Sequence, residues 1–188
     1  MVNTIRVSAK EQAINTAIAF LMRFEGFSLT AYPDPLKGEA IPTIGFGRTF
    51  NVDKTRVKMG DVSTLEIEKE HLKRTLTSLY DQIAASILIV NLSHTALFNV
   101  EWIRPRVVLG PNQMGAILSL VYNIGFSAWM KSTVRTKVMS GSDGITAAWL
   151  LWTKAAGKES HGLRNRRLEE SRLFFRGLSI KSCILPRC

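Results

Sequence analysis

The sequence predicts a mostly helical α+β fold, with one small β-containing region among longer helices. Apolar residues recur at helical spacing over much of the chain. Residues 28–50 instead combine closely spaced prolines and glycines with β character, which predicts a short hairpin or small sheet. A capping box at residues 63–66, Ser-Thr-Leu-Glu, then opens a long helix.

The composition is that of a soluble globular protein large enough to bury a core. Of the 188 residues, 46% are hydrophobic and 21% are charged, and chains of about 150 residues bury roughly 70% of their unfolded surface. The longest apolar runs are far shorter than the ~18 residues of a membrane span, and the N-terminus does not resemble a signal peptide. Cys183 and Cys188 could close only a tiny loop, so we expect incidental thiols in a reduced cytoplasmic product.

The net charge of +10 is concentrated in one half of the chain. Residues 1–100 carry 11 basic and 10 acidic side chains, whereas residues 101–188 carry 14 and 5. A basic face implies an anionic partner, such as nucleic acid, a membrane surface or a cell-wall polymer. The charge alone does not choose among them.

The first predicted elements are a helix over residues 9–24, stopped by Gly26, and the β region over residues 28–50. The capping box predicts a helix over about residues 63–87, with an apolar stripe on one side. At 1.5 Å per residue such a helix would span roughly 30–37 Å. That length is typical of a connector between two lobes.

Residues 91–110 fit no clear periodicity, and a helix follows from Pro111 to Gly125. Two further helices are predicted over residues 143–154 and 163–175. In the last helix we expect the apolar residues to face inward and the basic residues to form a solvated outer face. These basic residues are Arg164, Arg166, Arg167, Arg172 and Arg176.

Two carboxylates lie close together in the sequence beside the β region. Glu25 ends the first helix, where the negative end of the helix dipole disfavours its charged form, as a general acid requires. Asp34 lies between two prolines, which hold it on a defined turn. Each has a plain alternative, as a solvated glutamate and an ordinary turn residue. Together they suggest glycoside hydrolysis, which needs two carboxyl groups in different protonation states.

Other polar residues could complete such a site. Thr43 begins the strand and could position an attacking water, or it could simply be a β-branched strand residue. Tyr122 and Asn123 end a helix and could bind a sugar, or they could be a buried tyrosine and a helix cap. The three histidines show no ligand spacing, so we expect no metal and no cofactor.

The motifs resemble the phage-type lysozymes, the endolysin family of muramidases (glycoside hydrolase family 24) that includes the T-even phage lysozyme. Most of residues 10–177 match the family in order. The matching segments are FEG (24–26), AYPDP (31–35), PTIGFG (42–47), STLE (63–66), NQ (112–113), YNIG (122–125), KST (131–133), Trp152, GLRNRR (162–167) and FRG (175–177).

The resemblance implies a lysozyme-like two-lobe fold in a single domain over residues 1–177. The small β-containing lobe would cover about 25–62, the connecting helix about 63–87, and the helical lobe about 88–177 together with the N-terminal helix. Residues 178–188 would form a tail. Arg48 stands where a histidine often follows the strand, so an ion pair made there would be altered. Residues 91–110 look like an insertion.

The resemblance also implies a function and roles for individual residues. Glu25 would be the proton donor, Asp34 the second carboxylate and Thr43 the residue that helps hold the water. Hydrolysis of the β-1,4 bond between N-acetylmuramic acid and N-acetylglucosamine would need no cofactor. Residues that would contact the substrate lie on both lobes. They are Arg48, Thr49, Tyr122, Asn123 and Ser132.

We therefore expect a monomeric endolysin that degrades peptidoglycan and lyses a bacterial host. It would stay in the host cytoplasm until a holin releases it to the periplasm and cell wall. Its basic half would suit an anionic outer-membrane or wall polymer, and we expect no nucleic-acid partner. The alternatives are a lytic transglycosylase, a non-catalytic wall-binding protein and a nucleic-acid-binding protein.

Overall fold

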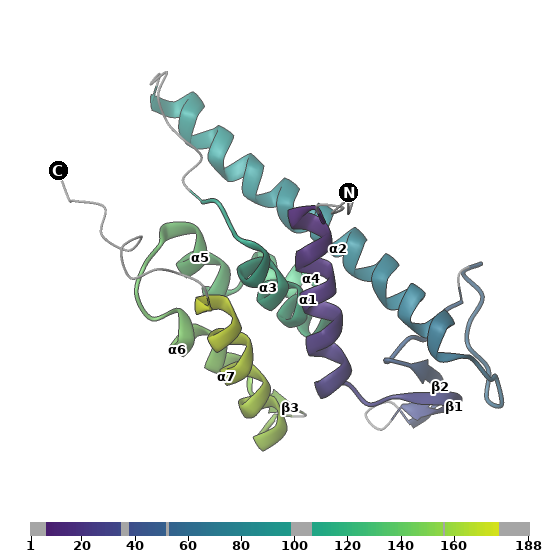
Figure 1. The fold of residues 1–188 in the computed structure, drawn as a ribbon. Helices are drawn as coiled ribbons and strands as arrows, with labels where there is room; N and C mark the ends of the chain where they lie inside the picture. Colours follow the sequence, from purple (N-terminus) through teal and green to yellow (C-terminus); the bar gives the residue numbers. More distant parts are fainter. Residues whose placement is uncertain (1–6, 35–37, 52, 99–106, 156, 177–188) are drawn as a thin grey trace, which may run out of the picture.

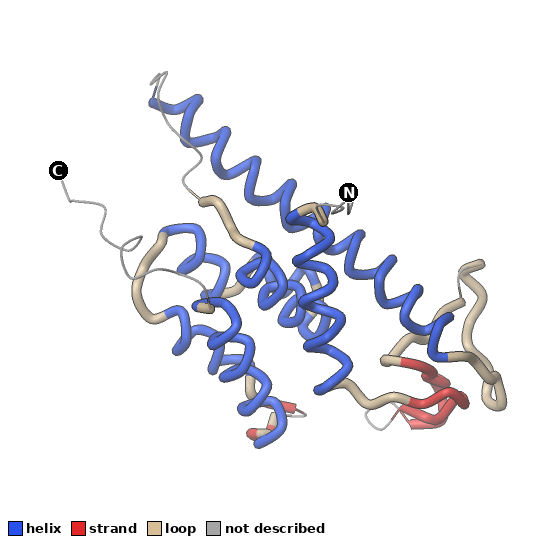
Figure 2. Tube along the Cα trace, in the orientation of Figure 1, coloured by secondary structure: helices blue, strands red, loops and turns tan. Residues whose placement is uncertain are grey.

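The computed structural model describes residues 7–34, 38–51, 53–98, 107–155 and 157–176. Within these ranges, the side chains of 34, 38–40 and 89–98 are outside the description. A long helix, α2 (Leu65–Phe98), runs along the molecule (Figure 1). Figure 2 shows the strands β1 and β2 at one end of this helix, and the remaining helices on one side of it. We call these two regions the small lobe and the helical lobe.

Helix α1 (Ala9–Phe24) has the bounds that the sequence predicts. The Ser8 hydroxyl accepts a hydrogen bond from the Glu11 N–H and so caps the first turn. One face of the helix is buried in the main core. The helix ends at Glu25, where the backbone becomes extended. This places Glu25 at the junction between the helical lobe and the chain that enters the small lobe.

The small lobe is an antiparallel hairpin of β1 (Ser28–Asp34) and β2 (Gly38–Gly45). Tyr32 lies opposite Thr43 in the register, and irregularities interrupt the pairing on either side of Tyr32 and Pro33. A separate small core lies against the hairpin and consists of Ala31, Ile44 and Val57. This core is too small to hold the lobe alone, so contacts with α2 matter.

Helix α2 is longer than the sequence predicts, because it continues to Phe98 rather than ending near residue 87. Its stripe of buried residues belongs to the main core: Leu72, Leu76, Ile83 and Ile87. Beyond residue 87, three apolar residues (88–90) are followed by a mixture of polar and apolar residues. No single helical face can therefore be recognised there. Of residues 91–110, which fitted no periodicity, 91–98 extend α2, and 99–106 lie outside the described residues.

An ion pair joins α2 to the strand β2. The Arg48 guanidinium, just after β2, donates from Nε and Nη2 to the Glu68 carboxylate at 2.8–2.9 Å. The Glu68 side chain is almost fully buried. Its carboxylate occupies the space where a Cβ at position 45 would lie, and Gly45 has a φ of +64°. Glycine is therefore required there both by backbone conformation and by the close approach of Glu68.

Helix α3 (Pro111–Ile124) lies at the centre of the helical lobe. Its Pro111 occupies the first turn, and eight consecutive residues from Met114 to Val121 are buried. It packs against α1, α2 and α7 (His161–Phe175). Because every face of α3 is covered, its last residues, Tyr122 and Asn123, are held in fixed positions.

The rest of the helical lobe consists of short elements, several of which the sequence did not reveal. They are α4 (Phe126–Met130), α5 (Thr133–Ser140), α6 (Ile145–Trp149), the 3-10 helix η1 (Leu150–Trp152), β3 (Lys154–Ala155) and β4 (Lys158–Glu159). The helix predicted over residues 143–154 is thus broken into α6, η1 and the start of β3. In the described part of the chain, none of the helices is long and apolar enough to cross a lipid bilayer.

The prediction that the basic residues of α7 form a solvated face is wrong for two arginines. Arg166 and Arg167 are 3% and 0% exposed, whereas Phe175, which was expected to face inward, is 44% exposed. The reason is a buried carboxylate, Glu170, with which both arginines form ion pairs. An arginine that has such partners can be buried.

The packing of α1 on α3 predicts the effect of a small substitution. A Cβ at Gly115 would lie 2.9 Å from Thr16 Cγ2, 3.0 Å from Thr16 Cβ and 3.2 Å from the Ala13 carbonyl oxygen. Gly115→Ala should therefore lower the free energy of unfolding by about 1–3 kcal/mol, although alanine favours an isolated helix by about 1 kcal/mol. Urea unfolding measures the change.

Two further variants test the cause of this loss. Thr16→Ala in the Gly115→Ala background should recover part of the lost stability. Gly162→Ala is the matched control, because a Cβ there meets only Ser160 Oγ, at 3.7 Å. A Gly115→Ala protein as stable as the wild type would contradict the packing described.

The Arg48–Glu68 ion pair predicts a pH dependence. Burial raises the pKa of Glu68, but hydrogen bonds and the positive charge of Arg48 outweigh it, so the pKa lies below its ordinary value. A depressed folded pKa contributes stability above the unfolded pKa of about 4.3, and this stability disappears as the pH falls through the folded pKa. Glu68→Gln should lower the free energy of unfolding by about 2–4 kcal/mol at pH 7. On acidification, its free energy of unfolding should fall less than that of the wild type.

Denaturant unfolding at pH 7, 5 and 3 measures this difference. Glu70→Gln is the matched control, because Glu70 lies on the same helix in an exposed ion pair with Arg74. Exposed ion pairs of this kind contribute little to the free energy of unfolding. Equal acid sensitivity in the wild type and Glu68→Gln would show that the ion pair is not the source.

Candidate active site

Residues from three separate elements meet around Glu25. Glu25 itself follows the last residue of α1, Tyr122 and Asn123 lie at the end of α3, and Arg166 and Arg167 lie in the first half of α7. Glu25, Tyr122 and Asn123 are among the site residues predicted from the sequence. The two arginines were instead expected on a solvated face.

Arg166 holds the Glu25 carboxylate directly. Its Nη1 donates to Glu25 Oε1 at 2.6 Å, and the Glu25 side chain retains about one-fifth of its exposure (20%). Within the described part of the chain, no hydrogen bond reaches the other carboxylate oxygen, Oε2. One oxygen of Glu25 is thus fixed from the protein interior, while the group as a whole stays accessible.

The guanidinium of Arg166 is itself held on its other sides. Its Nε donates to Glu170 Oε1 at 3.1 Å, and its Nη2 donates to the Ser119 carbonyl oxygen at 3.1 Å. These contacts come from α7 and α3, so the position of Arg166 depends on the packing of both helices. The bond to Glu25 extends this packing to the end of α1.

Arg167 makes a second connection from the same cluster to the site. Its Nη2 donates to Asn123 Oδ1 at 3.1 Å, and its Nε forms an ion pair with Glu170 Oε2 at 3.2 Å. Burial lowers the pKa of Arg167 to about 10, and the charge of Glu170 opposes that effect. Arg167 is therefore still a cation at neutral pH. Asn123 is exposed, with its amide oxygen turned toward the protein.

Glu170 also belongs to this cluster, although no role was predicted for it from the sequence. It is completely buried, and burial raises its pKa, although both arginines and the Ser119 hydroxyl act in the opposite direction. The spacing in the sequence could have predicted its contacts with the arginines, because Glu170 follows Arg167 by three residues and Arg166 by four. That spacing places all three side chains on one side of a helix.

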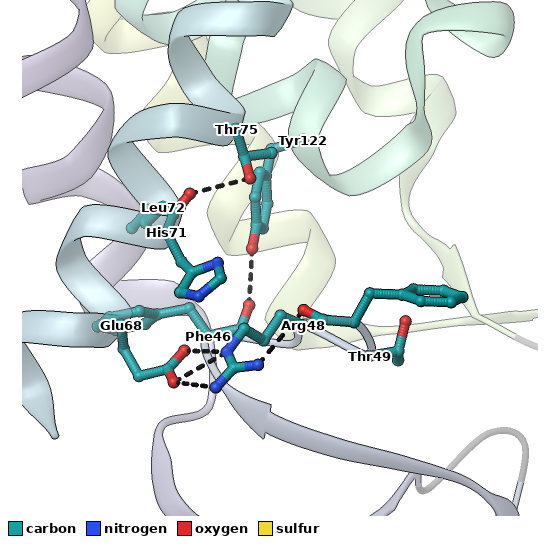
Figure 3. A pocket seen from close by; sticks show the side chains of 9 residues that line it. Phe46, Arg48, Thr49, Glu68, His71, Leu72, Thr75 and Tyr122 are labelled. Atoms are coloured by element: carbon teal, nitrogen blue, oxygen red, sulfur yellow. Dashed lines mark hydrogen bonds and ion pairs between the residues drawn. The ribbon is translucent and has the colours of Figure 1, made fainter. Parts of the chain in front are cut away.

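Tyr122 connects the two lobes. Its hydroxyl donates to the Phe46 carbonyl oxygen, in the turn after β2, at 2.8 Å, and Figure 3 shows the phenol pointing at this carbonyl. Burial, followed by the negative charge of Glu25, raises the pKa of Tyr122 to about 12. Tyr122 is therefore a hydrogen-bond donor throughout the physiological range.

The pocket in Figure 3 lies beside this connection and has a volume of about 220 Å³. Arg48, Thr49 and Tyr122, which were predicted to bind substrate, line it together with His71. Burial and the charge of Arg48 lower the pKa of His71, so its neutral form is favoured near pH 7. Arg48 itself forms an ion pair with Glu68.

The hairpin carries the remaining predicted catalytic residues. Thr43 is buried in β2 and its hydroxyl donates to the Ile41 carbonyl oxygen at 3.3 Å. Asp34 ends β1, and its backbone is paired with Gly38. The Asp34 side chain lies outside the described residues. Asp34 lies two residues after Tyr32, and Tyr32 is the partner of Thr43 in the register.

The structure gives Ser132 a local structural contact. Its hydroxyl accepts a hydrogen bond from the Arg135 N–H at 3.0 Å and caps α5, and the residue is buried. It is therefore placed differently from Asn123, whose side chain is exposed. Among the described residues, no group of three or more His, Cys, Asp or Glu side chains is arranged to hold a metal ion.

Comparison with known proteins identifies the family. A family model described as phage lysozyme matches residues 22–170. The endolysin of Salmonella phage P22 is 36% identical over 164 residues, which cover 87% of this chain and 97% of that protein. The endolysin of Acyrthosiphon pisum secondary endosymbiont phage 1 is 33% identical over 162 residues, which cover 84% and 93%.

Solved structures agree with the sequence comparison. A mutant of P22 lysozyme superposes with a TM-score of 0.66 at 35% identity and covers 92% of this chain and 99% of that one. The endolysin from Escherichia coli O157:H7 phage FAHEc1 gives a TM-score of 0.67 at 26% identity, with coverages of 92% and 96%. The predicted lysozyme-like fold is confirmed, and the chain belongs to the phage lysozyme family, whose members are enzymes that degrade peptidoglycan.

Proposed function

We propose that this enzyme hydrolyses the β-1,4 bond between N-acetylmuramic acid and N-acetylglucosamine, with Glu25 as the proton donor. The observation that carries the proposal is the setting of Glu25. Its carboxyl group is accessible at the junction of the lobes, and Arg166 fixes one of its oxygens at 2.6 Å. A general acid needs such a fixed but accessible position.

The contact with Arg166 determines which oxygen would carry the proton. In the protonated acid, Oε1 would be the carbonyl oxygen that accepts from Arg166, and Oε2 would carry the hydrogen. Oε2–H could then donate to the glycosidic oxygen as the bond breaks. After transfer, the carboxylate would be stabilised by the guanidinium that already contacts it.

Asp34 and Thr43 would act on the opposite side of the scissile bond. We assign Asp34 as the charged second carboxylate and Thr43 as the residue that helps to hold the attacking water, as in the family. The pairing of Tyr32 with Thr43 supports this assignment, because it brings Asp34 and Thr43 to the same end of the hairpin. Among the described residues, the Thr43 hydroxyl makes only a 3.3 Å hydrogen bond to a carbonyl of its own strand, so it could turn to a water.

Substrate binding would use both lobes. Arg48, Thr49 and Tyr122 line the pocket in Figure 3, and the exposed Asn123 follows Tyr122 at the end of α3. Ser132 would contribute through the placement of α5, since its hydroxyl caps that helix. This division leaves Asn123 as the polar side chain of the helical lobe best placed to contact a sugar.

The proposal extends to partners and location. The related phage proteins are named endolysins, and we propose that this enzyme also acts on the wall of a phage host, after accumulating in the host cytoplasm and leaving it through a holin. We further propose that it works as a monomer without nucleic acid. Its basic half favours an anionic wall or outer-membrane polymer, although Arg166 and Arg167 are buried and do not contribute to that surface.

Replacing the two carboxylates tests the mechanism. Glu25→Gln and Asp34→Asn should each reduce the clearing of a peptidoglycan suspension by about 10²–10⁴-fold, because one loses the proton and the other loses the charge. Both variants should keep the wild-type circular dichroism spectrum. Glu70→Gln, an exposed glutamate of α2, is the control for removing a carboxylate.

The products separate hydrolysis from the main alternative. A lytic transglycosylase would release 1,6-anhydro muropeptides, which are lighter by one water than the hydrolysed products. Mass spectrometry of the digest should find only reducing ends. Anhydro products, or full activity in both carboxylate variants, would refute the proposed mechanism. Lysis that persists in Glu25→Gln would instead point to a non-catalytic wall-binding protein.

A further inference from the structure

A buried carboxylate lies beneath the site, and the assignments above do not use it. Glu170 is 0% exposed. Its Oε1 accepts from the Ser119 hydroxyl at 2.7 Å and from Arg166 Nε at 3.1 Å. Its Oε2 accepts from Trp149 Nε1 at 3.0 Å and lies 3.2 Å from Arg167 Nε. Both oxygens are therefore fixed by neighbours from α3, α6 and α7.

Each of the two arginines reaches a different residue of the site. Arg166 uses Nη1 for Glu25, at 2.6 Å. Arg167 uses Nη2 for Asn123, at 3.1 Å. Because Glu170 follows these arginines by four and three residues on α7, a single carboxylate can hold both guanidinium groups. The contacts then form one chain from the Glu170 carboxylate to the acid and to the substrate-facing amide.

We propose that Glu170 is a positioning residue of the active site, which aligns Glu25 through Arg166 and Asn123 through Arg167. The inference rests on the proposed roles of Glu25 and Asn123. It assigns two separable effects to one buried side chain. The first acts on proton donation, and the second acts on substrate binding.

The first effect is electrostatic. Among the side chains that the structure describes, those with a charge or a titratable proton that interact with Glu25 are Arg166 and Arg167 from α7 and Tyr122 from α3. An uncompensated guanidinium beside a carboxyl group favours its charged form, which cannot donate a proton. Glu170 pairs with both arginines, so its removal would leave their positive charge unbalanced beside Glu25.

The second effect is orientational. Arg167 is a donor only, so the atom of Asn123 that it contacts must be the amide oxygen. The amide NH₂ group of Asn123 is thereby turned away from Arg167 and is available as a donor. It suits an acceptor oxygen on the substrate, such as an acetamido carbonyl or a sugar hydroxyl. Without Glu170, Arg167 would lose its ion-pair partner on α7, and the amide could rotate.

The alternative is a purely structural role, in which Glu170 only stabilises the packing of α7 on α3. Buried ion pairs commonly have such a role, and removing one partner destabilises a protein strongly. A loss of stability would therefore not distinguish the two interpretations. The pH profile and the separation of KM from kcat do distinguish them.

The principal variant is Glu170→Gln, which keeps the side-chain shape and removes the charge. Initial rates on soluble, uncross-linked peptidoglycan strands should give a kcat lower by about tenfold or more and a raised KM. The alkaline limb of the pH–kcat profile should move to lower pH. Glu169→Gln is the matched control, since the neighbouring Glu169 pairs with Arg172 on the surface, and it should match the wild type in all three.

A second variant keeps the test decisive if Glu170→Gln fails to fold. Arg167→Met/Glu170→Gln removes one positive and one negative charge together, which restores the charge balance around Arg166. Its alkaline limb should return toward the wild-type position. Its KM should stay raised, because Asn123 has lost the arginine that orients it.

The outcomes separate this inference from the proposed function. An unchanged alkaline limb and KM in a folded Glu170→Gln protein would overturn the positioning role, even if the protein melted at lower temperature. A wild-type KM in the double variant would overturn the connection through Arg167. The proposed function fails by a different result, namely activity that survives in Glu25→Gln.

Discussion

The buried guanidinium of Arg166 joins the elements on which the site depends. It bonds α7 to the end of α1 through Glu25, to α3 through the Ser119 carbonyl, and to its own helix through Glu170. Burying a charge is costly unless its partners are complete. Arg166 meets this condition with two carboxylates and the Ser119 carbonyl, whereas Arg167 Nε and Nη1 are buried without a hydrogen bond, although Nε lies 3.2 Å from Glu170 Oε2. The packing of three helices and the position of Glu25, the proposed acid, thus depend on the same set of contacts.

The small lobe is held to the helical lobe by contacts of a similar kind. The Tyr122 hydroxyl bonds the carbonyl of Phe46, and Glu68 of α2 bonds Arg48 beyond β2. The second contact brings a carboxylate against the backbone at Gly45, where no side chain would fit. The TIGFG segment is therefore glycine-rich because of what packs on it, as well as because of its turn. These contacts set how the hairpin faces Glu25.

Several features could be predicted from the sequence because a local pattern determines them. The bounds of α1, the start of α3 and the hairpin follow from periodicity, proline and glycine positions, and Glu25 at the helix end follows from the same signals. Roles that depend on distant partners could not be predicted. Arg166 and Arg167 resemble a solvated face until Glu25, Asn123 and Glu170 are known to lie around them.

Other differences have equally local causes. The end of α2 lacks a recognisable polar face. The helix expected over residues 143–154 begins only at Ile145, after Gly144 with its positive φ, and gives way to η1 and β3. Ser132 stands in a matching motif, but its hydroxyl is used by the first turn of α5. A motif locates a residue in the fold, and the neighbours of that residue then decide what its side chain can do.

The setting of Glu25 illustrates this limit. Its place at the end of α1 suggested that the helix dipole alone would favour the protonated acid. The structure adds an ion pair with Arg166 at 2.6 Å, which the position of Glu25 in the sequence could not reveal. Glu170 contacts the same guanidinium from the interior side. The behaviour of the acid is therefore a property of the whole buried cluster, and α7 belongs to the active site although the substrate need not touch it.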